Sequence, residues 1–121
     1  METAMHSIKI KRVYEAPSTG DGYRMLVDRL WPRGLKKENA SIDEWNKDIA
    51  PSTTLRRWFG HRPENFERFA ILYKQELSGR RDELKRIRSI TKKKNLTLLY
   101  AAKDEQLNQA LVLRELLLTT K

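Results

Sequence analysis

The chain has 121 residues, 39% of them hydrophobic and 34% charged, which indicates one globular domain with a sizeable core and a highly charged surface. It has no cysteine, so disulfides, thiolate nucleophiles and cysteine-bound zinc are excluded, and its two histidines are too few for a histidine-rich metal site. Lys and Arg number 25 against 16 Asp and Glu, and the net charge of +9 attracts polyanions without identifying one.

The amino end carries no secretory pattern, and we expect residues 1–7 to be a flexible terminus that precedes a single domain over residues 8–121. No apolar run is long enough to span a membrane. We therefore expect a cytoplasmic protein without a membrane partner, and the sequence leaves its oligomeric state open.

Two strands are predicted at the start of the domain. Residues 8–13 (IKIKRV) alternate apolar and basic side chains, which is typical of an edge strand with one wet face. Residues 15–22 (EAPSTGDG) have the composition of a loop. The second strand covers residues 23–28, where the apolar run from Met25 to Val27 indicates burial on both faces.

An arginine-rich loop follows the second strand. Asp28 lies at the end of an apolar run and loses most of its water, so its carboxylate needs a partner such as Arg29 or Arg33. Pro32 fixes its own φ and favours an extended Trp31. A rigid loop that carries guanidinium groups at the carboxyl end of a strand suits recognition of an anion.

The next segment is ambiguous. Residues 42–49 place apolar side chains at helical spacing, but Pro51 disfavours a helix just before it, and we predict a short strand or a turn. Ser52 is well placed to cap a helix over residues 53–59 that ends at Gly60.

Two further helices are predicted in the middle of the chain. The first begins at Pro63 and ends at Gly79, and the second covers residues 81–93 with a basic outer face. The inward stripe of the first comprises Phe66, Phe69, Ala70, Tyr73 and Leu77. We expect Trp45 and Trp58 to join these aromatic side chains in the core.

The carboxyl-terminal part is predicted as a strand and a helix. Residues 96–102 (LTLLYAA) give the clearest strand pattern of the chain. Lys103 and Asp104 form a charged corner after it, and Asp104 is expected to cap the final helix over residues 105–118. That helix is apolar almost all round, which predicts deep packing.

This order of elements predicts an α/β fold, namely a single domain with a small, mainly parallel central sheet flanked by helices in Rossmann-like layers. The strand at 96–102 should lie parallel to the strand at 23–28 through a helical crossover. Ligands of open α/β sheets lie beyond the carboxyl ends of the strands, so we expect the two charged corners to meet at one pocket.

The predicted site is formed by these corners. Arg29 and Arg33 are expected to grip a phosphate or carboxylate group with their planar guanidinium groups, while Lys103 adds a point charge. Asp28, the candidate catalytic residue, orients an arginine or accepts a proton. The other predicted ligand-binding residues are Trp31, which stacks on a base or sugar or else fills the core, Asp104 and Asn108. The structural alternative is an ion-pair network that ties the loop to the sheet, with Asp104 as an ordinary helix cap.

Nucleic acid is the rival class of partner, bound by a basic face of the helices without reading of its sequence. The residues of that face would be Arg56, Arg57, Arg62, Arg80, Arg81, Lys85, Arg86 and Arg88. A solvated helical surface is the favoured explanation, because no helix-turn-helix or RNA-binding signature accompanies these residues.

Other chemistry finds little support. The sequence has no Walker A motif, no dinucleotide-binding glycine pattern and no HExxH, and no fixed spacing of its aspartates supports a magnesium site, so we expect no metal or cofactor. His61 follows a helix-ending glycine and is expected to make a local hydrogen bond or stay wet. A catalytic triad of Ser52 and His61 is rejected because no nucleophile elbow surrounds Ser52.

Three long segments carry a resemblance to a known family. VDRLWPRG (27–34), DIAPSTTLRRWFGHRPE (48–64) and LLYAAKDEQLNQALVLRELL (98–117) resemble the YeaO-like proteins, a bacterial and archaeal domain-of-unknown-function family (number 488). The resemblance covers nearly the whole chain from Ile8 and implies a small cytoplasmic α/β protein without an established activity. Relatives often read K-D-E-x-H-N after the last strand. Here Leu107 stands in place of the histidine, so the resemblance brings no histidine base or metal ligand at that position.

We therefore expect an uncharacterised family protein that binds a small anionic ligand at the strand ends, with acid–base chemistry by Asp28 left open. The alternative is a non-catalytic nucleic-acid-binding protein.

Overall fold

The strands of the central sheet all run parallel in the computed structural model, which describes residues 6–119. They are β1 (Ile8–Arg12), β2 (Tyr23–Leu26), β3 (Glu44–Trp45) and β4 (Leu96–Tyr100), in the spatial order β1-β4-β2-β3. Every residue of β4 is buried, as expected for a strand that is paired on both edges and covered on both faces. The predicted parallel placement of residues 96–102 beside residues 23–28 is confirmed, and so are the edge position of β1 and a short strand within residues 42–49.

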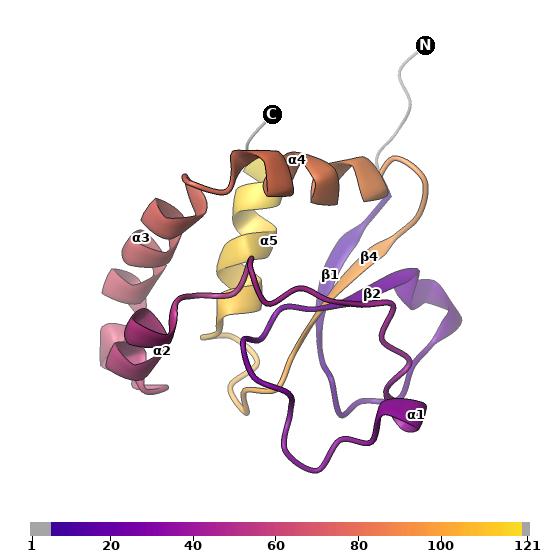
Figure 1. Ribbon diagram of the computed structural model, residues 1–121, viewed down its shortest axis with the longest axis horizontal. Helices are drawn as coiled ribbons and strands as arrows, with labels where there is room; N and C mark the ends of the chain where they lie inside the picture. Colours follow the sequence, from indigo (N-terminus) through magenta and orange to yellow (C-terminus); the bar gives the residue numbers. More distant parts are fainter. Residues whose placement is uncertain (1–5, 120–121) are drawn as a thin grey trace.

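Four helices of the described chain contribute to one core on one face of this sheet (Figure 1). They are α2 (Thr53–Phe59), α3 (Phe66–Leu77), α4 (Arg81–Ile90) and α5 (Gln109–Thr119), and a 3-10 turn, η2 (Pro63–Asn65), precedes α3. The predicted stripe of α3 is confirmed, because Phe69, Tyr73 and Leu77 are buried and Phe66 and Ala70 pack against the same cluster. This core packs against one face of β2 and β4, because Met25 of β2 and Leu98 of β4 belong to the same cluster.

The other face of the sheet is covered by the connection from β2 to β3. Its cluster contains Leu26 and Leu99 from the sheet, with Trp31, Leu35 and Trp45 packed against them. The connection contains only one helical turn, α1 (Lys37–Ala40), which Figure 1 shows well apart from α2–α5. The α/β fold is therefore as predicted, but a loop replaces one of the two expected layers of helices.

The basic residues of β1 have buried partners on this second face. Lys9 and Lys11 place their Nζ atoms 3.0 and 3.1 Å from the carboxylate of Asp21, which belongs to the 3-10 turn η1 (Thr19–Asp21), and Arg24 also pairs with it. Burial raises the pKa of the Asp21 carboxyl, but hydrogen bonds from Lys9, Ser18 and Lys11 outweigh it and hold that pKa well below its ordinary value. Lys9, Lys11 and Arg24 thus stabilise the fold through Asp21, so part of the positive charge of the chain needs no external partner.

The start of the final helix differs from the prediction. Asp104 does not cap α5, because its Oδ1 accepts the N–H groups of Gln106 and Leu107 in a turn before the helix. Asn108 is the cap instead, since its Oδ1 accepts the N–H of Leu111 at 3.0 Å. The helix therefore begins at Gln109, four residues later than expected.

Other helix boundaries are close to the predicted ones. Ser52 caps α2 as predicted, with its hydroxyl accepting the N–H of Leu55, and the helix ends at Gly60, where φ is 55°. The core position expected for Trp58 is wrong, because this side chain is 46% exposed. α4 ends at Ile90, short of the predicted residue 93.

Both ends of the described chain lie near α4 in Figure 1. Of the terminus predicted to be flexible, residues 1–5 lie outside the described part, while the N–H of His6 donates to Thr91 O and the carbonyl of Ser7 accepts the N–H of Leu96. None of the helices within residues 6–119 is long and apolar enough to cross a lipid bilayer.

The register of β2 beside β4 depends on a close backbone contact at Gly22, and we predict that Gly22→Ala lowers the free energy of unfolding by roughly 3 kcal/mol or more. A Cβ there would lie 2.2 Å from the carbonyl oxygen of Asn95, and φ is already 66°. Gly34→Ala is the matched control, because Gly34 has a similar φ of 76° but open space around a Cβ, and it should cost only about 1 kcal/mol. Urea unfolding measures both; equal losses would contradict the role of the contact with Asn95.

Candidate anion-binding site

The two charged corners predicted from the sequence meet at the carboxyl edge of the sheet. Val27 N–H donates to Leu99 O at 3.0 Å, just past the ladder that pairs β2 with β4. One residue further on, the Oδ2 of Asp28 accepts the N–H of Ala101 at 2.9 Å. The ends of β2 and β4 therefore lie side by side, while the pocket expected between the two charged corners stays a prediction.

The carboxylate of Asp28 joins three elements in what we call the Asp28 junction, made by Asp28, Ala101 and Gln109. Gln109, the first residue of α5, donates its Nε2 to the second carboxylate oxygen of Asp28. Burial raises the pKa of the Asp28 carboxyl to about 6, because the hydrogen bonds from Ala101 and Gln109 and the charge of Arg56 offset the loss of water only in part. This carboxyl therefore titrates close to neutral pH.

Arg29 has a structural role that the sequence did not reveal. Its Nε donates to Pro51 O at 2.9 Å and its Nη2 to Ala50 O at 3.2 Å. The guanidinium group thus fastens the loop after β2 to the chain that enters α2. It forms no ion pair with Asp28, and the expectation that it is a partner of that carboxylate is wrong.

Arg33, by contrast, has an exposed side chain, and only its backbone carbonyl is used, by the hydroxyl of Tyr14 at 2.8 Å. The guanidinium of Arg12 lies over the ring of Tyr14, 5.1 Å from its centroid, and donates to the carbonyls of Ala101 and Ala102. Arg12 and Tyr14 therefore reach the same edge of the sheet. No local pattern pointed to these two residues, because the basic side chains of residues 8–13 indicated only a wet strand face.

The other predicted ligand-binding residues divide into exposed and buried ones. Lys103 and Asp104 are exposed on the loop that leaves β4. Asn108 is fully buried and uses its Nδ2 on Asp104 O at 2.9 Å, so its amide is turned into the loop and away from solvent. Trp31 is half-buried, donates to Leu35 O at 2.8 Å and lies edge-on to Trp45, 5.3 Å between ring centroids. Trp31 and Asn108 thus shape the loops.

Arg56 adds an unexpected cation to this edge. Its charge lowers the pKa of Asp28, although α2 lies far from Asp28 in sequence. Its Nε is buried and has no acceptor among residues 6–119. A buried N–H without an acceptor costs about 1–3 kcal/mol, so this atom marks a place where water or an anion would be stabilised.

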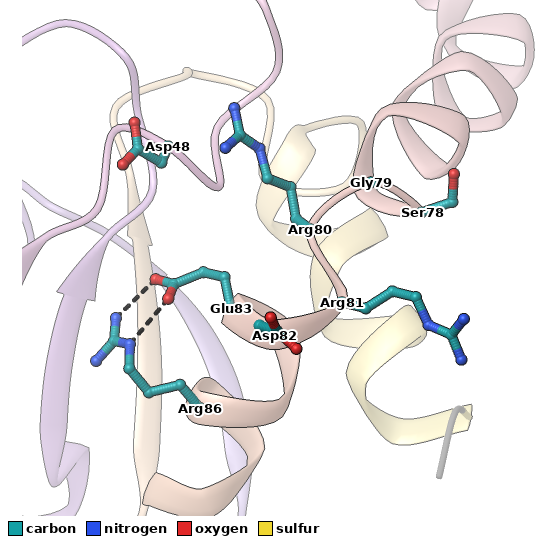
Figure 2. Close-up of a pocket in the computed structure, with 8 residues that line it drawn as sticks. All are labelled: Asp48, Ser78, Gly79, Arg80, Arg81, Asp82, Glu83 and Arg86. Carbon is teal, nitrogen blue, oxygen red and sulfur yellow. Dashed lines mark hydrogen bonds and ion pairs between the residues drawn. The ribbon is translucent and has the colours of Figure 1, made fainter.

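A separate hollow of about 750 Å³ lies beside the turn between α3 and α4. Figure 2 shows Arg80 extended toward Asp48, Arg81 directed away, and Glu83 paired with Arg86. Positive and negative groups alternate around this hollow, which makes it a weaker place for an anion than the edge near Arg56. It contains none of the residues predicted for the site.

The basic helical face expected for nucleic acid is interrupted. Arg86 binds the carboxylates of Glu44 and Glu83, and Arg88 donates to Leu117 O. The members that are exposed and form no ion pair within residues 6–119 are Arg57, Arg62, Arg80, Arg81 and Lys85. These side chains come from α2, from the turn before η2 and from the start of α4, not from one helix face.

Residues 6–119 contain no group of three or more acidic or imidazole side chains that could hold a metal ion. His61 is exposed in the turn after α2, with φ at 57°. It lies on a different connection from the Asp28 junction.

Comparison with known proteins gives one family and several relatives. A family model described as "Inactive DUF488-N3 subclade" matches residues 7–121. Uncharacterized protein YeaO of Escherichia coli (strain K12) is 49% identical over 109 residues, which cover 90% of this chain and 95% of that protein. Uncharacterized proteins of Mycobacterium bovis (Mb3100c) and Mycobacterium tuberculosis (Rv3073c) are each 39% identical over 110 residues, covering 91% of this chain and 92% of theirs. No solved structure shows significant similarity to the chain.

We predict opposite outcomes for the two arginines of the loop after β2. Arg29→Ala removes two hydrogen bonds and leaves two carbonyls without their donor, so it should lower the free energy of unfolding by roughly 2–3 kcal/mol. Arg33→Ala should change it by less than about 0.5 kcal/mol, because the bond from Tyr14 goes to the backbone. Urea unfolding of both variants is the measurement, and a large loss in Arg33→Ala would point to a structural network instead of a ligand site.

The stability of the protein should depend on pH through Asp28. Its pKa is about 6 in the folded chain against 3.8 as a free group, so between these values the folded state holds the proton that the unfolded state has lost. The free energy of unfolding contributed by this group is therefore highest below about pH 4 and falls by roughly 2–3 kcal/mol as the pH rises to about 6.

Asp28→Asn is the variant that isolates this effect, because the amide keeps the shape and one acceptor but does not titrate. Urea unfolding at several pH values from 4 to 7 should show that the difference between wild type and variant changes across this window. A constant difference would mean that the carboxyl titrates with its ordinary pKa.

Proposed function

This chain belongs to the family described as the inactive DUF488-N3 subclade, and we propose that it binds a small phosphate- or carboxylate-bearing ligand at the carboxyl edge of β2 and β4 without turning it over. The observation that supports the proposal most is the buried Nε of Arg56, which lies close enough to Asp28 to lower its pKa and has no acceptor within the described residues. An anion would supply that acceptor.

Two exposed cations border the same edge. Arg33 follows β2 and Lys103 follows β4, and neither forms an ion pair among residues 6–119. A guanidinium group offers a planar pair of donors to a phosphate or carboxylate, and an ammonium group adds charge without fixing direction. Arg56 would hold the ligand from inside, and Arg33 with Lys103 from the rim.

The protonation state of Asp28 determines how the affinity for the ligand depends on pH. An ionised carboxylate next to the ligand repels an anion, whereas a protonated carboxyl is neutral and can donate a hydrogen bond. Because the pKa of Asp28 is raised to about 6, a slightly acidic solution removes this repulsion. Binding of the anion and binding of the proton should therefore strengthen each other.

Binding without turnover agrees with the description of the subclade as inactive. Both carboxylate oxygens of Asp28 already accept hydrogen bonds, from Ala101 and from Gln109. These two bonds tie the carboxyl to the end of β4 and to the first residue of α5. We accordingly assign Asp28 a positioning role.

The test is a thermal-shift screen of the full chain at pH 6 and pH 8 with inorganic phosphate, nucleotides and small organic acids. A ligand at about 100 times its Kd should stabilise the protein by about 2.7 kcal/mol, and the stabilisation should be larger at pH 6 than at pH 8. Arg56→Ala and Arg33→Ala should each remove the shift, whereas Lys85→Ala, an exposed cation on α4, should leave it unchanged.

No shift with any anion, or a shift that both arginine variants retain, would overturn the proposal. A gel shift with DNA or RNA that weakens steeply as salt rises and disappears on charge reversal at Arg80 and Lys85 would favour the nucleic-acid alternative.

A further inference from the structure

A groove of about 700 Å³ runs between α2 and α3, outside the candidate anion-binding site. These two helices lie against each other on the side of the molecule away from β1 (Figure 1). The side chains that line the groove include Leu55, Trp58, Arg68, Leu72, Gln75 and Glu76. Leu55, Trp58 and Leu72 supply the apolar part of this lining, and its other residues, Ser52 and Thr54 among them, are polar.

Two large apolar side chains are half-exposed at or beside this groove. Trp58 is 46% exposed and Ile71 is 47% exposed. On α3, Arg68, Ile71, Leu72 and Gln75 follow the spacing i, i+3, i+4, i+7, and so form a second stripe in addition to the buried one. Exposed apolar side chains that gather in this way mark a surface for contact with another molecule.

The charges at the groove are complementary to an acidic partner. Its carboxylate, Glu76, is already used, because it accepts the N–H and the hydroxyl of Ser52 at 2.9 and 2.6 Å. Arg68 is the cation of the groove lining and forms no ion pair with any residue in the described range. Arg57 is exposed on α2 outside that lining. The groove therefore presents an unpaired positive charge, and the whole chain also has a positive net charge of +9. Both favour a partner with negative charges.

We propose that this groove binds an acidic amphipathic helix of a partner protein, independently of the proposed anion ligand. From Arg68 to Gln75 the stripe extends for about 10 Å, or two helical turns. A partner helix would place apolar side chains at i and i+4 against Trp58 and Leu72. Its carboxylates would pair with Arg68 and Arg57. Trp and Arg are also the residue types that most often dominate the binding energy of an interface.

The experiment is selection of random twelve-residue peptides displayed on phage against the full chain, followed by fluorescence anisotropy with the enriched peptides. We expect enriched sequences with Asp or Glu beside large apolar residues at i and i+4. Trp58→Ala should weaken their binding about thirtyfold, as is typical of a dominant interface residue. Arg68→Glu should weaken it as strongly, most of all at low salt.

The matched control is Lys85→Glu, which makes the same charge change on an exposed residue of α4 and should leave the affinity unchanged. Because Trp58 and Arg68 are exposed, both variants should keep the unfolding midpoint of the parent.

Several outcomes would overturn the proposal: no enriched peptide, enrichment of basic or uncharged peptides, or affinities that both groove variants leave unchanged. Sedimentation that shows a dimer abolished by Trp58→Ala would assign the groove to a second copy of the chain instead. Binding of a single-stranded oligonucleotide that both variants abolish would assign it to nucleic acid.

Discussion

The arrangement of the carboxyl edge depends on one desolvated carboxylate, that of Asp28. The end of β2 supplies this group, the end of β4 supplies the N–H of Ala101, and the first residue of α5 supplies the amide of Gln109. Removing any of the three would leave a buried polar group without a partner, which costs about 1–3 kcal/mol. The same contacts place the loops after β2 and β4 side by side, so a constraint of the fold creates the candidate site.

A second theme of the structure is the use of arginine to satisfy backbone carbonyls in the connections and near the ends of strands and helices. Long connections leave many such carbonyls, and a guanidinium group with five N–H donors can reach two of them at once. The pairs are Arg12 with Ala101 and Ala102, Arg24 with Ser41 and Ala40, Arg29 with Ala50 and Pro51, Arg88 with Leu117, and Arg114 with Ile8. A high arginine content therefore reflects the fold itself as well as any anionic partner.

Prediction from the sequence succeeded where the signal was local. The run in β4, the cap at Ser52 and the stripe of α3 each follow from a short pattern, and the parallel pairing of β2 with β4 follows from chain connectivity. It failed where the partner lies far away in sequence. Nothing near Arg29 shows that it binds Ala50 and Pro51, and nothing near Arg56 places it beside Asp28. Trp58 was expected inside because large aromatic residues usually are, but α2 is too short and peripheral to bury it.

The raised pKa of Asp28 invites an assignment as an acid–base catalyst, yet it follows from burial alone. Loss of water raises the pKa of the Asp28 carboxyl more than its two hydrogen bonds lower it, and this holds whether or not the group meets a substrate. Two buried arginine N–H groups lack an acceptor within residues 6–119, the Nε of Arg56 and the Nη2 of Arg88, and an unpaired buried N–H brings no benefit to the fold. Of the two, Arg56 is the one whose charge acts on Asp28. A binding role is therefore better argued from the unsatisfied donor than from the perturbed acid, and this is why the proposed ligand is an anion held by arginine, with Asp28 as the group that tunes it.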